Sequence, residues 1–500
     1  MADTQTIAQS APKTPAWDPA APENAWYKWR AFWAVGLSLV TMVMSFSIIF
    51  LALPAIAEDF GITFKEASLL VIAQSLTISS LMVPLGKVAD MIGRKKFHLI
   101  GMALFGGGAI ACAFATSLTF LIITRVIMSI GSSMGQSVST AITTSVFPAS
   151  ERGKALGSQT TAVAIGGAAG TVVSGVTLQF LPWQALFIFM AIPTAVAFFW
   201  GLYILKDERI GSFSGEKRPP YDWLGAALSA VATAIIILTI TNPFALAWGS
   251  PIIIAGAFTG IATLIVFVWW QLKTPNPMVD LRLFKNKVFK YSIITRYLAF
   301  MRSSATLFVL PIYLVAFRGW PEILASGVML MMAIGMGIGA QVFGRLSDRY
   351  GVRPFMMGGF FFLVLTGIAL ATLDDTSNVI YIAVVVLING LAMGAWSAPN
   401  ASATMGSVPQ SAYGLVSAII NLTRNLGNVS GQAIITAIIA GVMIARGFNI
   451  PLGELEDTPE AGFAFMDGWK YAYLAATGVV ALAFITSFLT KPGKNESQAT

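Results

Sequence analysis

Long apolar stretches alternate along the chain with short polar and charged segments. Fourteen of these stretches are each about 20 residues long, enough for an α-helix to cross a hydrocarbon core of ~30 Å. They begin near Ala31, Glu66, Phe97, Leu118, Ala155, Trp183, Trp223, Pro251, Tyr291, Ile323, Pro354, Val379, Tyr413 and Tyr471. Because backbone polar groups inside a bilayer must bond within their own segment, the pattern predicts an all-α integral membrane protein with fourteen spans.

Composition excludes several other classes of protein. Hydrophobic residues make up 56% of the chain and charged residues only 11%, whereas soluble domains carry about 25% charge. The net charge of +8 is spread over short loops rather than gathered in one patch, so we expect the lipid bilayer and no nucleic acid as partner. The single Cys112 and the single His98 exclude a disulfide framework and a histidine metal cluster. We find no catalytic pair or phosphate loop, and expect no enzyme, no metal and no cofactor.

Two polar loops share one pattern and lie at equivalent places between apolar stretches. The first runs from Gly86 to Lys96 and reads GKVADMIGRKK, and the second runs from Gly344 to Arg353 and reads GRLSDRYGVR. Glycines permit tight turns there, and Asp90 and Asp348 are placed to cap helix ends and pair with charges. A duplicated loop indicates a duplicated half.

The paired G-x-x-x-D-x-x-G-R loops resemble the signature of the major facilitator superfamily. Fourteen spans with a central pair, opened by Asp222-Trp223-Leu224-Gly225, resemble its drug exporter branch, and the resemblance extends from about Ala31 to Thr490. It implies two six-helix halves that rock about a central cavity, with an inserted helix pair between them. It also implies a gating role for Gly86, Asp90, Gly93, Arg94, Gly344, Asp348, Arg349 and Gly351.

We divide the chain on this basis into five parts. These are a disordered cytoplasmic tail (1–30), the N-terminal six-helix half (31–205), cytoplasmic loops with the inserted helices (206–288), the C-terminal six-helix half (289–490) and a second cytoplasmic tail (491–500).

The distribution of basic residues predicts the orientation. With the N-terminus inside, 23 of the 31 Lys and Arg residues fall on the cytoplasmic side, as the positive-inside rule requires. Both termini are then cytoplasmic, in a multi-pass protein of the plasma membrane. The longest external loop, roughly Gly447 to Gly468, is acidic.

In the superfamily that the chain resembles, the first and fourth helices of each half line the cavity. The corresponding stretches here carry polar stripes, and Arg302 lies about 16 Å from the start of its helix, near mid-membrane. We therefore predict substrate contacts at Ser45, Arg125, Gln136, Arg302, Asn389, Trp396 and Asn400.

Acidic residues are missing from the middle of every predicted span. The exporter branch is expected to carry an aspartate about two turns before Ala52-Leu53-Pro54, and Ser45 stands there instead. Arg302 thus has no acid to neutralise it: either water or an anionic substrate compensates its charge, or it bonds backbone carbonyls and only holds its helix in place. We interpret Arg296 as extending toward the cytoplasmic boundary, and the stripe around Arg424 as helix packing.

These features predict a secondary transporter that exports a small amphipathic compound, anionic or neutral, by rocker-switch alternating access. The alternative is a proton-coupled multidrug efflux antiporter, which the resemblance favours and Ser45 weakens. A third class is a membrane sensor or assembly protein that keeps the fold without transporting. Coupling to protons or a counter-ion stays open, and we expect a monomer.

Overall fold

The computed structural model describes residues 21, 24–210, 220–242, 246, 249–448 and 458–488. Within this part, the chain forms fourteen helices long and apolar enough to cross a membrane, and no β-strand. The N-terminal half comprises α1 (Ala25–Phe60), α2 (Phe64–Ile92), α3 (Arg94–Ala113), α4 (Leu118–Val146), α5 (Arg152–Phe180) and α6 (Gln184–Ile204). The C-terminal half comprises α9 (Lys287–Ile312), α10 (Glu322–Tyr350), α11 (Val352–Ala371), α12 (Val379–Gly406), α13 (Tyr413–Ala445) and α14 (Gly462–Ser487). The predicted fourteen-span, all-helical class is confirmed.

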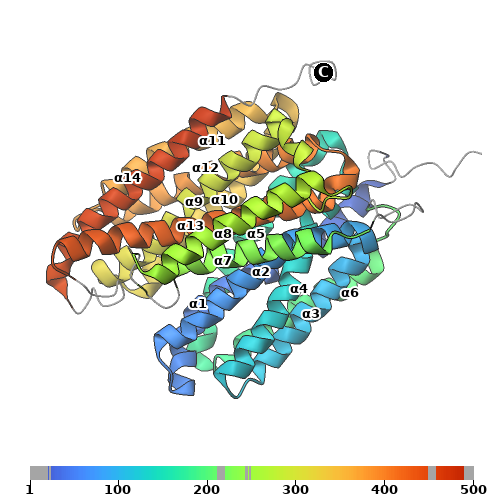
Figure 1. Ribbon diagram of the computed structural model, residues 1–500. Helices are drawn as coiled ribbons and strands as arrows, with labels where there is room; N and C mark the ends of the chain where they lie inside the picture. Colours follow the sequence, from blue (N-terminus) through green and yellow to red (C-terminus); the bar gives the residue numbers. More distant parts are fainter. Residues whose placement is uncertain are drawn as a thin grey trace, which may run out of the picture.

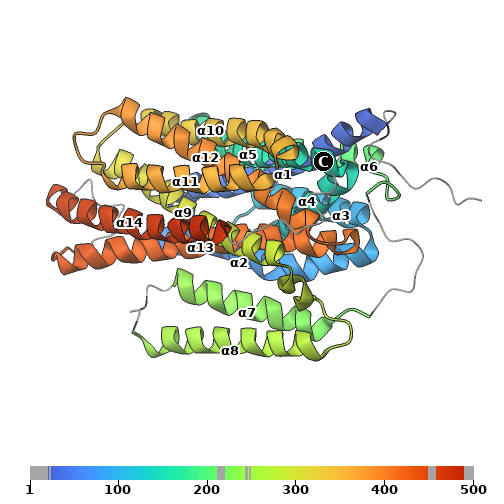
Figure 2. The same ribbon diagram turned by 90° about the horizontal axis from the view of Figure 1, so that it is seen from above.

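The inserted pair consists of α7 (Trp223–Thr241) and α8 (Pro251–Lys273). Figure 1 shows the two halves as separate bundles, and Figure 2 shows α7 and α8 along one flank of the molecule. Helix α7 packs against α2 and α13, one from each half, while α8 packs against α7. Short turns of helix connect the spans: η2 (Ala149–Glu151), η3 (Leu281–Lys285), η4 (Tyr313–Phe317), η5 (Gln410–Ala412) and η7 (Pro459–Ala461).

Two predicted boundaries are wrong, and the first is the start of α1. This helix begins at Ala25 rather than Ala31, so residues 25–30 are helical and not part of a disordered tail. Tyr27 explains the difference, because its buried hydroxyl accepts a hydrogen bond from the backbone N–H of Lys206 at 3.0 Å. Trp29 adds an edge-on contact with Phe147, 5.2 Å between ring centroids. The predicted tails 1–20 and 491–500 lie outside the described residues.

The second wrong boundary is the start of α14, which lies at Gly462 rather than near Tyr471. Phe465 and Trp469 are fully buried, and the Trp469 indole donates a hydrogen bond to the carbonyl oxygen of Leu370 at 2.7 Å. Lys470 interrupts the apolar pattern but lies on the exposed face. The predicted acidic external loop is therefore shorter than expected, and its residues 449–457 lie outside the described part.

The hydrogen bonds that join the halves cluster toward one end of the molecule, where α2 turns into α3. They involve the first third of α5 and of α13, the loop before α13, and the second half of α10. Apolar clusters at the other end belong to one half each. Among the described residues, the halves are thus closed against each other at the Asp90 end.

Candidate functional site

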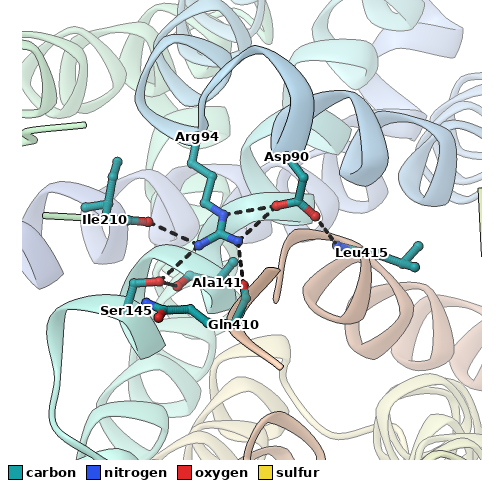
Figure 3. A network of polar contacts seen from close by, with 7 residues as sticks. All are labelled: Asp90, Arg94, Ala141, Ser145, Ile210, Gln410 and Leu415. Atoms are coloured by element: carbon teal, nitrogen blue, oxygen red, sulfur yellow. Dashed lines mark hydrogen bonds and ion pairs between the residues drawn. The ribbon is translucent and has the colours of Figure 1, made fainter. Parts of the chain in front are cut away.

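Asp90 ties the end of α2 to the beginning of α13 (Figure 3). Its carboxylate accepts a hydrogen bond from the backbone N–H of Leu415 at 3.1 Å and two from Arg94, at 2.9 and 3.1 Å. Arg94 also donates to the carbonyl oxygen of Gln410, just before α13, at 3.2 Å. An anionic group at a helix N-terminus is stabilised by the unpaired N–H groups there, so this contact holds the two halves together.

Arg94 is anchored in its own half as well. It is buried, and its guanidinium donates to the hydroxyl of Ser145 and the carbonyl oxygen of Ile210, both at 3.1 Å. Ser145 in turn donates to the carbonyl oxygen of Ala141 at 2.8 Å (Figure 3). The arginine therefore links α2, α4 and the segment after α6 to the C-terminal half.

Asp348 makes the equivalent contact in the opposite direction. Its two carboxylate oxygens accept hydrogen bonds from the backbone N–H groups of Gly153 and Lys154, in the first turn of α5, at 2.6 and 2.9 Å. Arg349 does not follow Arg94, because it is exposed and its guanidinium lies over the Tyr350 ring, 5.4 Å from the centroid. Each signature aspartate thus caps a helix of the other half.

Two of the predicted gating glycines turn the chain between helices. Gly93 (φ 104°) and Gly351 (φ 84°) occupy equivalent positions in the two loops, and both have a positive φ. Residues with a Cβ adopt this conformation only with strain. The positive φ therefore explains why glycine occupies this position in both loops.

The other two predicted gating glycines lie at contacts between the halves. A Cβ on Gly86 would lie 2.5 Å from the Cβ of Ala418, and a Cβ on Gly344 would lie 2.5 Å from the carbonyl oxygen of Gly153. Any side chain would therefore force α2 from α13, or α10 from α5. All eight predicted gating residues lie at the Asp90 end, although Arg349 takes no part in the contacts just described.

Arg125 lies in the interior of the N-terminal half and is fully buried. Its guanidinium donates to the backbone carbonyl oxygen of Ser45 at 2.8 Å and to the amide oxygen of Gln74 at 2.5 Å. It also lies 5.7 Å from the centroid of the Phe187 ring. The structure brings the predicted pair Ser45 and Arg125 together, but through the backbone of Ser45.

Arg302 lies inside the C-terminal half rather than at the boundary between the halves, which corrects our placement. Its fully buried guanidinium donates to the amide oxygen of Asn389 on α12, and to the hydroxyl of Thr366 on α11 at 3.4 Å. The polar face of α9 was predicted correctly, but that face turns toward α11 and α12. The hydrophobic periodicity of a sequence shows which face of a helix is polar. It does not show which neighbouring helix packs against that face.

Trp396 and Asn400 are also enclosed by the C-terminal half. Trp396 is fully buried, stacked on Phe360 with ring centroids 5.4 Å apart and edge-on to Phe300 at 5.2 Å. The amide of Asn400 donates to the backbone carbonyl oxygen of Ser292 at 3.0 Å. In the described conformation both side chains join α12 to its neighbours α9 and α11.

Gln136 is the predicted substrate residue that lies between the halves. Its amide oxygen accepts a hydrogen bond from Arg424 on α13 at 2.7 Å, and its backbone carbonyl oxygen accepts one from Asn421 at 2.9 Å. Its own amide group donates to Ser132 on α4 at 2.8 Å. This group crosses the boundary about three turns into α13.

Arg424 and Arg296 are the residues that our sequence reasoning missed as site candidates. Arg296 is buried, donates through Nε to the carbonyl oxygen of Ile420 at 3.1 Å, and lies 5.1 Å from the centroid of the Phe300 ring. Its side chain is buried rather than extended to an exposed surface, and the positive charge of Arg424 acts on it. Two arginines on polar helix faces were the available signal. Which helices meet at the seam, the contact of α2, α4 and α5 with α10 and α13, could not be read from sequence.

Carboxylates lie only near helix ends within the described helices. In the fourteen long helices the acidic residues are Glu58, Asp59, Glu66, Asp90, Glu322, Asp348 and Asp467. Among the described residues there is no cluster of acidic, histidine or cysteine side chains that could hold a metal ion. Within the described helices, no acidic residue therefore pairs with any of four arginines, Arg125, Arg296, Arg302 and Arg424.

Asp222 organises the end of the inserted pair that lies nearest Asp90. Its carboxylate accepts hydrogen bonds from the backbone N–H of Gly225, the indole of Trp270 and the amide of Gln271, at 2.7–2.8 Å, and from the N–H of Met278 at 3.4 Å. Partial burial opposes ionisation, but these four hydrogen bonds outweigh it and hold the pKa of Asp222 below its ordinary value. Both inserted helices and the segment after them are thus joined at one carboxylate.

The same end of the inserted pair bridges the two halves. The hydroxyl of Tyr221 donates to the carbonyl oxygen of Pro84 on α2 at 3.1 Å. One apolar cluster combines Val83 of the N-terminal half, Ala226 and Phe267 of the inserted pair, and Leu415 of the C-terminal half. The inserted helices therefore cover the seam between α2 and α13.

Comparison with known proteins identifies the architecture. The family model described as Major Facilitator Superfamily matches residues 35–432. The riboflavin transporter RibZ of Clostridioides difficile (strain 630) is 28% identical over 473 residues, covering 94% of this chain and 99% of that protein. The multidrug resistance protein Stp of Mycobacterium tuberculosis (strain H37Rv) is 25% identical over 491 residues, covering 91% and 90% respectively.

A solved structure shows the same fold at low sequence identity. The human organic anion transporter MFSD10 (TETRAN) superposes with a TM-score of 0.65 at 14% identity, covering 92% of this chain and 99% of that one. At this identity the likeness concerns the fold alone.

Proposed function

The chain belongs to the major facilitator superfamily, and from this membership we propose that it exports a small amphipathic organic compound, anionic or neutral, by alternating access. Membership itself makes the protein a multi-pass secondary transporter and not an enzyme. The relatives include a riboflavin transporter and a multidrug resistance protein. Riboflavin is itself a neutral amphipathic compound, so it serves as the first probe of the proposal.

One observation carries the proposed charge preference: Arg424 reaches across the seam to Gln136, Arg296 lies near enough behind it in the C-terminal half for the two charges to interact, and no acid of the described helices stands beside them. Arg424 is partly exposed and reaches across to Gln136. Arg296 keeps one terminal guanidinium nitrogen buried without a hydrogen-bond partner. Two neighbouring positive charges repel each other, and an anionic group or the negative end of a dipole placed between them relieves that cost.

The side chains next to Arg424 and Arg296 are polar and uncharged. They can bind the uncharged polar groups of a substrate whose anionic group lies between the two arginines. Asn425 and Asn428 follow Arg424 on α13, are partly exposed, and each has an amide atom without a hydrogen-bond partner. Amides donate and accept, so they bind hydroxyl and carbonyl groups alike. We assign the substrate site to this part of the seam, with Gln136 opposite.

The orientation predicted from the basic residues places the Asp90 end in the cytoplasm. The described conformation is then closed to the cytoplasm, and substrate would leave on the opposite side. Return to the cytoplasmic-facing state requires α2 to separate from α13 and α10 from α5, which breaks the contacts of Asp90 and Asp348. We assign the gating role of the signature loops to these contacts, in a protein working as a monomer.

The second candidate is proton-coupled efflux of hydrophobic drugs, which the relationship to Stp favours. Such coupling normally uses a titratable group at membrane depth, and carboxylates in the described helices lie only near helix ends. The anionic or neutral substrate class is therefore the better supported of the two.

The test is transport in proteoliposomes with and without an imposed pH gradient. Riboflavin and its 5′-phosphate share one ring system and differ in charge, and a permanently cationic dye of similar size completes the set. We expect transport of the first two, with a preference for the phosphate that Arg424→Gln abolishes. Transport of the cationic dye alone, driven by the pH gradient, would overturn the proposal in favour of drug antiport.

A further inference from the structure

The segments that lead into α5 and α13 repeat one pattern. Residues 148–153 read PASERG, and residues 409–414 read PQSAYG. In each segment a proline stands before one turn of 3₁₀-helix, η2 or η5, and the long helix begins directly after that turn. Arg152 and Tyr413 are the first residues of α5 and α13, and they therefore occupy equivalent positions in the two halves.

These two equivalent residues are in direct contact across the halves. The Arg152 guanidinium donates a hydrogen bond to the Tyr413 hydroxyl at 2.8 Å, although the residues are 261 positions apart in the chain. The guanidinium also lies 5.9 Å from the centroid of the Tyr413 ring, within reach of a cation–π interaction. Equivalent parts of two repeats meet only near the pseudo-two-fold axis that relates them. The pair thus lies near the axis between the halves.

The pair also lies between the capping contacts of the two signature loops. Arg152 directly precedes the two residues whose N–H groups bond to Asp348. Tyr413 stands two positions before Leu415, whose N–H bonds to Asp90 (Figure 3). Helix α5 packs against α10, and α13 packs against α2, so the two caps belong to different helix pairs of the seam. Arg152 and Tyr413 join one helix pair to the other.

Both side chains are fixed by their surroundings. The Tyr413 ring is buried in an apolar cluster that includes Phe289 of α9. On the other side, Glu151 pairs with Lys28 of α1 at 2.8 Å, which anchors the segment just before Arg152 in the N-terminal half. A hydrogen bond between groups that are each fixed in a different half resists separation of the halves.

Arg152 reaches a second helix end of the C-terminal half. A Cβ on Gly406, the last residue of α12, would lie 3.3 Å from a terminal guanidinium nitrogen of Arg152. A positive charge beside the C-terminus of a helix is stabilised by the carbonyl groups that end there. Arg152 therefore contacts the end of α12 as well as the beginning of α13.

We propose that Arg152 and Tyr413 form a third gating contact, placed near the axis between the halves and outside the signature loops. In the closed state this pair holds α5 to α13, and when the halves separate at this end the hydrogen bond breaks and water solvates both groups. Because the pair lies between the two capped helix pairs, it opposes opening at either of them. This gating contact rests on the proposed alternating access and adds two residues that stabilise its closed state.

The experiment measures distances between two pairs of spin labels in the purified full-length protein, in a cysteine-free background. Labels at Lys96 and Ser411 report the separation of α2 from α13, and labels at Ser150 and Arg345 report that of α5 from α10; all four positions are exposed. Tyr413→Phe removes the hydroxyl and keeps the ring. We expect it to raise the open population about tenfold for both label pairs, as loss of a hydrogen bond to a charged group does.

Tyr297→Phe is the matched control, because the Tyr297 hydroxyl makes its hydrogen bond within the C-terminal half, with Ser430 at 2.9 Å. Each substitution removes one phenol hydrogen bond and should lower the unfolding temperature to a similar extent, whereas only Tyr413→Phe should change the label distances. The double variant Arg152→Met/Tyr413→Phe should open no further than Arg152→Met alone, since both changes remove the same hydrogen bond.

Unchanged distances for both label pairs in Tyr413→Phe would overturn the proposal, and so would opening at one label pair alone. Additive effects of the two substitutions would also contradict it. If Arg152→Met does not fold, Tyr413→Phe still decides the outcome, because the buried ring stays in place. The label distances are measured without substrate, so a protein that transports riboflavin but keeps its distances in Tyr413→Phe would refute this gating contact alone.

Discussion

The carboxylate of Asp90 in α2 accepts a hydrogen bond from the backbone N–H of Leu415 in α13, 3.1 Å away in the other half. Asp348 repeats the relationship with Gly153 and Lys154 of α5. Two helices that begin in different halves are therefore each capped by an aspartate from the opposite half. We therefore expect the closed state at this end to depend on both charges.

Asp90→Asn should shift the equilibrium toward the state that is open at this end. The charge at the helix N-terminus is lost, which costs about 1–2 kcal/mol or a factor of about 5–30 in population. Spin labels at Lys96 and Ser411, both exposed, report the separation in a Cys112→Ser background. Asp348→Asn should have a smaller effect, because Asp90 also positions Arg94. Asp375→Asn, an exposed aspartate, serves as control; an equal shift in this control would contradict the gating role.

Gly86→Ala should favour the same open state through a steric clash between α2 and α13. The new Cβ would lie 2.5 Å from that of Ala418, so α2 and α13 must separate. The double variant Gly86→Ala/Ala418→Gly should recover much of the closed population in the same label measurement. Gly107→Ala is the control, since a Cβ there meets nothing within 4 Å. Failure of the double variant to recover would mean that the defect arises elsewhere.

Gln136→Glu should make transport depend on pH, because it places an acid away from the helix ends, where the described helices have none. The new carboxylate would face Arg424 across the seam, where the wild-type bond measures 2.7 Å. A charged pair holds the halves together more strongly, which should slow transport about tenfold or more at neutral pH. Protonation as the pH falls should restore the rate.

The double variant Gln136→Glu/Arg424→Gln tests this interpretation of Gln136. It should lose the slowing at neutral pH, because the carboxylate no longer faces a cation. Initial transport rates of riboflavin, measured from pH 5 to pH 8, compare the variants. A rate that stays equally low in the double variant would show that the introduced carboxylate perturbs the fold rather than the seam.

Asp222→Asn should lower stability at neutral pH and make it less sensitive to acid. The pKa of Asp222 is lowered in the folded protein, so its ionised form stabilises the fold. That contribution is present above the unfolded-state pKa of about 4 and is lost as the pH falls toward the lower folded-state value. Unfolding temperatures of the two proteins should therefore converge below about pH 4. If the unfolding temperatures of the two proteins instead differ by the same amount at every pH, the lower stability of Asp222→Asn arises from altered packing and not from the lost charge.

The sequence by itself determined the class of the protein and the position of its two signature loops. Length and hydropathy suffice for the spans, because a bilayer of fixed thickness admits only helices of a minimum apolar length. Asp90 and Asp348 were recognisable because each belongs to a local motif, a turn between two helices. The position of the acidic residues near the ends of the described helices was equally readable from the sequence.

Only the tertiary structure decided what each buried polar face meets. Periodicity placed Arg302 and Thr306 on one face of α9, but the packing of α11, α12 and α14 turns that face into the C-terminal half. Gln136 and Arg424 lie 2.7 Å apart although they belong to different halves. A helix has the same polar stripe whichever neighbour covers it, and the neighbour is selected by contacts between residues hundreds of positions apart. Gln136 and Arg424 therefore meet across the seam, whereas Arg302 is enclosed by its own half.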